Sequence, residues 1–155
     1  MARQSRSGYR IAIASNQSGV SRGLFALSEL HAMHQRLREI LAEAGGRIEM
    51  IAFCPHGPDA GCVCRKPGPG LLEEIADRLD CNLAGVPFIG DSISDVRAAR
   101  RGGAEPWLVR TGKGERTLAR LRRSDPGTTS ELDGVPVFLD LAEACERLIQ
   151  SSRYI

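Results

Sequence analysis

Short apolar runs alternate with amphipathic helical patterns along the chain, and this alternation restricts the folds that it can adopt. The apolar runs predict strands at 9–15, 48–53, 86–90, 107–110 and 135–140. Apolar residues at helical spacing predict helices at 27–44, 70–79, 92–101, 115–123 and 141–151. Continuously apolar strands separated by helices are typical of a parallel sheet that is covered on both faces. We therefore expect an α/β fold with a doubly wound, Rossmann-like parallel sheet.

The length and the charge of the chain exclude several classes of function. With 155 residues the chain has the size of one domain, so we expect a single domain over residues 1–155. The net charge of +2 is too small to indicate nucleic acid or a membrane surface as a partner. No apolar run has the length of a membrane span, and the start lacks the apolar core of a signal peptide. We expect a cytoplasmic monomer that acts on a small molecule.

One loop carries a concentrated set of metal-binding side chains. The sequence CPHGPDAGCVC at 54–64 combines three thiols with one imidazole. This is the ligand set of a closed tetrahedral zinc site, formed by Cys54, His56, Cys62 and Cys64. Four protein ligands leave no open position, so the zinc would be structural and would present the adjacent Arg65 and Lys66. The alternative, a turn with unrelated free thiols, is disfavoured by the spacing.

Polar residues follow the expected strands at the edge of the sheet where parallel strands end. They are Ser15, Asn16, Gln17 and Ser18, then Arg65 and Lys66, then Asp91, Ser92 and Asp95, and finally Arg110, Thr111 and Lys113. Cations and hydroxyl groups bind phosphoryl oxygens, and a carboxylate binds magnesium, which prefers oxygen ligands. The alternative for any single loop is that it is polar because it is exposed. Together, the loops predict a phosphate and magnesium site.

Four segments resemble the zinc-loop phosphatases of the haloacid dehalogenase superfamily. They are SNQSGVSRGLF at 15–25, CPHGPDAGCVCRKPGPGLL at 54–72, GDSISDVRAA at 90–99 and LVRTGKG at 108–114. The resemblance extends over roughly residues 8–148 and is strongest to the branch that acts on heptose bisphosphates for lipopolysaccharide synthesis. The histidinol-phosphate phosphatase branch shares the zinc block, so the zinc loop alone does not separate the two.

The resemblance implies roles for several residues of these segments. Ser15 and Lys66 would be catalytic, because they would steady the transferring phosphoryl group and neutralise its charge. Asp91 would bind Mg²⁺, while Zn²⁺ would occupy the cysteine and histidine loop. Asp95 would orient its neighbours, cap the following helix or touch the metal. The residues that would bind the sugar phosphate are Ser15, Asn16, Gln17, Ser18, Arg65, Lys66 and Ser92.

An aspartate pair that the resemblance leads one to expect is absent from these residues. Phosphatases of this superfamily attack with an aspartate on the first strand, and a second aspartate two residues later protonates the leaving oxygen. None of the eight aspartates in this chain has another aspartate two positions away. The resemblance thus implies that the usual first strand is missing, with roughly forty residues, about one strand-and-loop unit, absent before Met1.

The expected function is therefore a magnesium-dependent phosphatase that removes a phosphate from a sugar bisphosphate. Without the covalent nucleophile, the remaining cations would bind phosphate but would not carry out the two-step reaction of the family. The strands on either side of the missing one would also face a gap. Two alternatives remain open, a histidinol-phosphate phosphatase and a non-catalytic remnant that binds phosphate.

Overall fold

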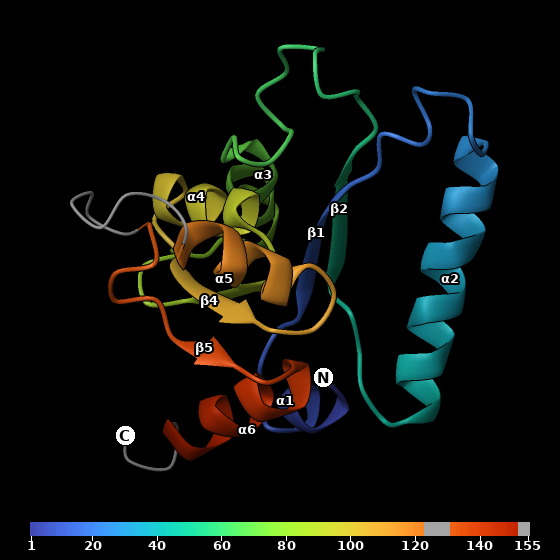
Figure 1. Cartoon of the computed structure of the whole chain (residues 1–155). Coiled ribbons are helices and arrows are strands. Elements are labelled where there is room, and N and C mark those ends of the chain that lie inside the picture. Colours follow the sequence, from blue (N-terminus) through green and yellow to red (C-terminus); the bar gives the residue numbers. More distant parts are fainter. Residues whose placement is uncertain (123–130, 152–155) are drawn as a thin grey trace.

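The computed structural model describes residues 1–122 and 131–151, and it confirms the alternation of strands and helices (Figure 1). Arg123, the last residue of the fourth expected helix, lies outside the described residues. The elements are α1 (Ala2–Arg6), β1 (Ala12–Asn16), α2 (Leu27–Glu43), β2 (Met50–Cys54), α3 (Gly70–Leu79), β3 (Pro87–Gly90), α4 (Ile93–Arg101), β4 (Glu105–Val109), α5 (Gly114–Arg122), β5 (Val137–Phe138) and α6 (Leu141–Ser151).

The strands are parallel, as expected, but they form two separate sheets. One contains β1 and β2, paired from Ala12 with Met50 to Asn16 with Cys54. The other has the order β3-β4-β5, in which both pairs of neighbours are parallel. In the described part of the chain, β1 and β3 are not paired with each other. Each therefore keeps one edge without a strand neighbour from the described residues.

Helices cover the β1-β2 sheet from both sides, which is the doubly wound arrangement. Figure 1 shows α2 on one side of β1 and β2, with α3 and α4 on the other. The loop after β1 and the loop after β2 lie together beyond the upper ends of these two strands. Because parallel strands end at the same edge, this edge collects the polar residues that follow β1 and β2.

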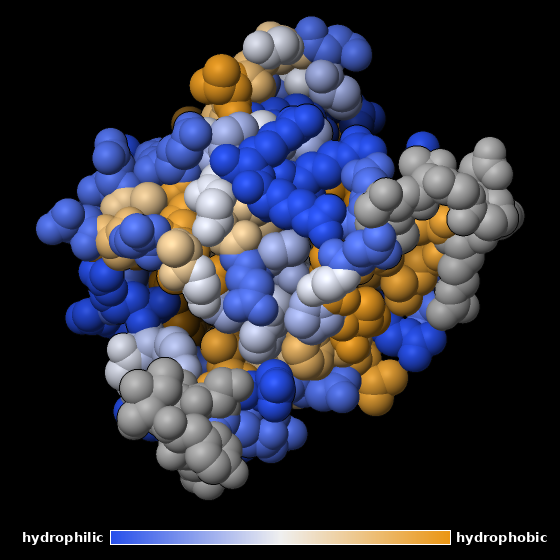
Figure 2. All heavy atoms as spheres, turned by 90° about the vertical axis from the view of Figure 1, so that its left-hand side faces the viewer, coloured by the Kyte–Doolittle hydropathy of each residue, from blue (hydrophilic) through white to orange (hydrophobic). Residues whose placement is uncertain are grey.

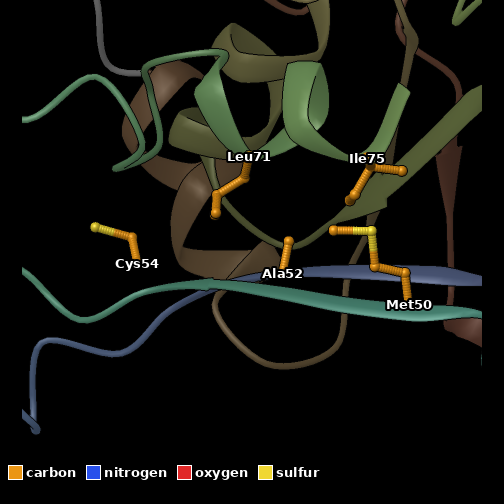
Figure 3. Close-up of a cluster of buried hydrophobic side chains, with 5 residues drawn as sticks. All are labelled: Met50, Ala52, Cys54, Leu71 and Ile75. Atoms are coloured by element: carbon orange, nitrogen blue, oxygen red, sulfur yellow. The ribbon is translucent and has the colours of Figure 1, made fainter. Parts of the chain in front are cut away.

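One cluster of buried hydrophobic side chains joins α3 to β2 (Figure 3). Leu71 and Ile75, four residues apart on α3, pack on Met50, Ala52 and Cys54, which alternate along β2. Figure 3 shows Cys54 at one end of this row. Because Cys54 is fully buried, the first thiol of the cysteine and histidine loop is anchored in the core.

The two outer helices differ in how well they are packed. On α4, Val96, Ala98 and Ala99 are buried. Figure 2 shows the left-hand side of the molecule in Figure 1, and much of this face is hydrophilic. On α2, only Leu30 and Leu41 are buried. The remaining large apolar residues of α2 are exposed, namely Leu27, Met33, Leu37 and Ile40.

The last strand is shorter than expected, because only Val137 and Phe138 pair with β4. Pro136 has no N–H to donate, although its carbonyl accepts a hydrogen bond from the backbone N–H of Leu108 at 2.9 Å. None of the helices in the described residues is both long and apolar enough to cross a membrane.

Candidate active site and zinc loop

The four expected zinc ligands lie together at the end of β2. Their ligand atoms are all within 4.8 Å of one another. Cys54 Sγ lies 3.6 Å from Cys62 Sγ and 3.2 Å from Cys64 Sγ. His56 Nδ1 lies 3.3 Å from Cys64 Sγ. A zinc tetrahedron with bonds of about 2.3 Å to sulfur has edges of about 3.8 Å. The side chains therefore fit one zinc ion, with His56 Nδ1 as the nitrogen ligand.

Burial and neighbouring groups shift the pKa values of two of the thiols, Cys62 and Cys64. Burial opposes ionisation of Cys62, but the backbone N–H of Arg65 and the neighbouring thiols and imidazole lower its pKa to about 7. Burial and the adjacent Cys54 and Cys62 raise the pKa of Cys64 to about 12. A metal that binds here must displace the thiol protons that remain, as is usual for zinc sites.

Lys66 is the cation that joins the two sheets. Its Nζ lies 2.7 Å from Asp95 Oδ1 and donates to the carbonyl of Ala14 on β1, also at 2.7 Å. It lies 5.4 Å from the centre of the Phe88 ring on β3. An ammonium group has three N–H donors, so these two bonds leave one donor for a ligand.

Asn16, at the end of β1, contacts the backbone of Lys66 with both ends of its amide. Asn16 Oδ1 accepts from the Lys66 N–H at 3.0 Å, and Asn16 Nδ2 donates to the Lys66 carbonyl at 3.0 Å. The Cα partner of Asn16 across the sheet is Cys54, one of the expected zinc ligands. The structure therefore connects Asn16, Lys66 and the zinc loop, a connection that the sequence did not reveal.

Asp91, the expected magnesium ligand, lies directly after β3. Its Oδ2 accepts the backbone N–H of Lys113 at 2.9 Å, and its carbonyl accepts from Thr117 Oγ1 at 3.0 Å. Gly112 allows this approach, because it has a φ of +62° and a Cβ there would collide with Asp91 Oδ2. Within the described residues these bonds engage Oδ2 but not Oδ1, so Oδ1 is the oxygen that a cation would meet.

Asp95 caps the helix that follows Asp91. Its Oδ2 accepts hydrogen bonds from Ser92 Oγ at 2.6 Å and from the backbone N–H groups of Ser92 and Asp91 at 3.0 and 3.2 Å. Ser92 is the N-cap of α4, and its Oγ accepts from the Asp95 N–H at 3.4 Å. Asp95 thus orients the Asp91 loop with one carboxylate oxygen and holds Lys66 with the other.

The remaining expected site residues make local contacts. Ser15 Oγ accepts from Gln17 Nε2 at 2.8 Å, and the Ser18 carbonyl accepts from Ser21 Oγ at 3.1 Å. Arg65 Nη1 donates to the His56 carbonyl at 3.0 Å, so the zinc loop itself orients this arginine. No hydrogen bond within residues 1–122 and 131–151 joins Ser15, Gln17 or Ser18 to Lys66 or Asp91.

Two residues of the site were not singled out by sequence reasoning. Gly112 is needed for the approach of its loop to Asp91, and its sequence signal is only a glycine in a polar turn. Ala14 contributes a backbone carbonyl to Lys66, and a backbone group leaves no mark on the sequence.

The fold is a parallel α/β fold in which a lysine and two carboxylates lie near the ends of the strands, the place where such folds bind their ligands. In agreement with this fold class, the HAD-hydrolase-like family matches residues 63–136. The D-glycero-beta-D-manno-heptose-1,7-bisphosphate 7-phosphatase of Pseudomonas aeruginosa is 47% identical over 97% of this chain and 79% of that protein. The enzyme of the same name from Pseudomonas putida is 49% identical over 96% of this chain and 80% of that protein. The chain belongs to this phosphatase family of HAD-like hydrolases.

Solved structures agree with this assignment. The crystal structure of D,D-heptose 1,7-bisphosphate phosphatase from B. bronchiseptica, complexed with magnesium and phosphate, has a TM-score of 0.87 and 45% identity over 97% of this chain and 79% of that chain. The enzyme from Burkholderia thailandensis has a TM-score of 0.70 and 34% identity over 96% of this chain and 80% of that chain. The expected family and fold class are therefore confirmed.

Proposed function

We propose that the chain provides the substrate-binding and magnesium-binding site of a phosphatase directed at D-glycero-D-manno-heptose 1,7-bisphosphate. The observation that carries this proposal is the identity of 45–49% to phosphatases of that name over nearly the whole chain. The arrangement of Lys66, Asp95 and Asp91 supports it, because it provides a held cation and a metal-binding carboxylate at one edge. Magnesium, when bound, supplies positive charge that polarises the phosphoryl group.

The residues of the chain have distinct parts in this proposal. Lys66 binds a phosphoryl oxygen with its third N–H, while Asp95 and Ala14 fix the direction of the other two. Ser15 donates its hydroxyl hydrogen to the same group, since its Oγ already accepts from Gln17. Arg65, held by the His56 carbonyl, recognises the sugar phosphate as a planar fork of donors. Zinc at the four-ligand loop is structural and orders Arg65 and Lys66.

The two carboxylates of the site, those of Asp91 and Asp95, do not supply the nucleophile. Asp91 is engaged by Lys113, and Asp95 is engaged by Lys66 and by the cap of α4. Neither is placed as a nucleophile in the proposal. Without a covalent nucleophile the two-step route is not available. We therefore expect residues 1–155 by themselves to bind phosphate but to hydrolyse phosphate esters slowly.

Two further proposals concern the domain that contains the site and the place where the protein acts. We take residues 1–155 as a single phosphatase domain, because Lys66 and the packing of Leu72 with Ala14 and Phe88 connect the two sheets. We also propose that the protein acts in the cytoplasm on a small sugar phosphate, as a monomer and without nucleic acid or membrane partners.

Binding and phosphate release can be measured separately on residues 1–155. The protein with zinc and magnesium is titrated with inorganic phosphate, with heptose 1,7-bisphosphate and with histidinol phosphate, and phosphate release is followed in parallel. We expect binding of heptose bisphosphate that requires both magnesium and Lys66, with little release. The variant Lys66→Met should lose most of this binding, whereas Arg36→Met should retain it, because Arg36 forms exposed ion pairs with Glu39 and Glu43 on α2.

The alternatives predict different results. Preference for histidinol phosphate would overturn the proposed substrate. Rapid release of phosphate by residues 1–155 would show that these residues do contain a working nucleophile. Binding that persists without magnesium and in Lys66→Met would remove the proposed site altogether.

A further inference from the structure

We propose that Asn16 is a positioning residue that fixes Lys66, rather than a residue that contacts the substrate. The inference rests on the proposed function in one respect, namely that Lys66 is the phosphate-binding cation. It departs from the substrate-binding role that the sequence suggested for Asn16. The geometry of the amide is the observation that carries it.

Both ends of the Asn16 side chain are bonded to one residue that is far away in the sequence. Oδ1 accepts the N–H of Lys66 and Nδ2 donates to its carbonyl, each at 3.0 Å. The side-chain amide thus satisfies the two backbone groups of Lys66 as a neighbouring strand would. Because Asn16 presents a donor and an acceptor together, an alanine or an ionised aspartate at this position cannot satisfy both groups.

The pair of bonds places the lysine along the edge of β1. Ala14 and Asn16 are two residues apart on β1, so their backbone groups face the same edge. Lys66 makes two contacts with this part of β1. Its backbone N–H donates to the Asn16 side chain, and its Nζ donates to the Ala14 carbonyl. Asn16 therefore fixes the backbone position from which the Lys66 ammonium reaches Ala14 and Asp95.

Asn16 also connects this lysine to the zinc loop. Its Cα partner on β2 is Cys54, and Cys64 lies two residues before Lys66. Zinc would tie Cys64 to Cys54, and Asn16 ties Lys66 to the strand beside Cys54. The loop that presents Lys66 is thus held at two neighbouring points. Removal of the Asn16 amide would release the backbone of Lys66 but leave Cys64 tied to Cys54 by zinc.

Hydrogen exchange at the Lys66 amide tests the contact directly. The zinc-loaded protein is compared with Asn16→Ala by NMR, with exchange rates measured for assigned backbone amides. We expect exchange at Lys66 to accelerate about tenfold, as follows from the loss of one hydrogen bond. Asn82→Ala is the matched control, because Asn82 Oδ1 likewise accepts a backbone N–H, that of Ala84 at 2.8 Å, in an exposed turn. It should change exchange at Ala84 and leave Lys66 unaffected.

Phosphate binding separates positioning from substrate contact. Affinity for inorganic phosphate in the presence of magnesium is measured for the wild type, Asn16→Ala, Lys66→Met and the double variant. If Asn16 acts through Lys66, its substitution weakens binding in the wild type but has no further effect in Lys66→Met. Additive losses, or a loss of affinity with unchanged exchange at Lys66, would overturn the proposal in favour of direct contact.

A second variant keeps the proposal testable if Asn16→Ala does not fold. Asn16→Asp retains an acceptor for the Lys66 N–H but faces its carbonyl with a second acceptor. Exchange at Lys66 should then remain slow, and rapid exchange in this variant would contradict the assigned contact. The exchange measurements need neither substrate nor turnover, so they test the contact between Asn16 and Lys66 even if the proposed phosphatase function fails.

Discussion

Lys66 Nζ lies 2.7 Å from Asp95 Oδ1, and the two side chains are only 12% and 9% exposed. Burial of two charges is costly unless their remaining hydrogen-bonding groups are satisfied. Here the ammonium also donates to Ala14, and the carboxylate also accepts from Ser92 and the backbone of Asp91. The ion pair therefore joins β1, the end of the zinc loop and the start of α4.

The first prediction concerns the stability that depends on this pair. Asp95→Asn leaves a buried ammonium without its counter-charge, so the free energy of unfolding should fall by about 3–5 kcal/mol. Urea denaturation of the zinc-loaded protein measures the change. Glu74→Gln is the control, because its pair with Arg78 is exposed and should contribute about 1 kcal/mol or less. Equal effects of the two substitutions would mean that the buried pair is not a structural link.

The second prediction concerns zinc. The protein should contain about one equivalent of zinc, since its four ligands form a single closed tetrahedral site. Cys62→Ser and Cys64→Ser should each lose this metal and lower the stability of the loop, as measured by elemental analysis and thermal unfolding. Cys81→Ser should keep the metal, because Cys81 is not part of the ligand group. Full zinc content in Cys62→Ser would exclude the assigned ligand set.

The zinc ligands and the order of the elements could be predicted from the sequence because their signals are local. Cys54, His56, Cys62 and Cys64 lie within one short loop, and their spacing alone indicates a metal site. The strands and helices follow from the periodicity of neighbouring apolar residues.

The contacts that build the site have no comparable local signal. Lys66 reaches Asp95 and Ala14 across separations that only the tertiary fold determines. A sequence shows Asn16 as a polar residue at the end of a strand, but it does not show which backbone the amide will meet. The apolar residues of α2 likewise predict a helix, yet not that Met33 and Ile40 stay exposed.

The third prediction is a dependence of stability on pH. Arg97 forms two hydrogen bonds of 2.5 Å with Glu131, and these lower the pKa of the Glu131 carboxyl from its usual 4.5. A carboxyl whose pKa is lowered in the folded state stabilises the fold above its unfolded pKa, and this contribution is lost as the pH falls through the folded pKa. The pair therefore stabilises the protein at neutral pH but not in strong acid.

Glu131→Gln tests this dependence. It should lower the free energy of unfolding at neutral pH by about 1 kcal/mol or less, because the pair is partly exposed. The difference from the wild type should vanish once the pH is below the folded pKa. Glu39→Gln is the control, since Glu39 makes only exposed contacts among the described residues, with Gln35 Nε2 at 3.1 Å and with Arg36 Nη1 at 3.4 Å. A difference that grows on acidification would contradict the assigned sign.

The fourth prediction separates two effects of replacing Gly112, the strain of its own backbone and the displacement of its loop from Asp91. Gly112 and Gly103 both have positive φ, +62° and +76°, but a Cβ at Gly112 meets Asp91 Oδ2, whereas one at Gly103 meets nothing within 4 Å. Both alanine variants should lose about 1 kcal/mol from the left-handed conformation. Only Gly112→Ala should also weaken magnesium-dependent binding of phosphate, because it moves the Lys113 N–H away from Asp91. Equal phosphate affinity of the two variants, measured by calorimetry, would show that the loop does not orient this carboxylate.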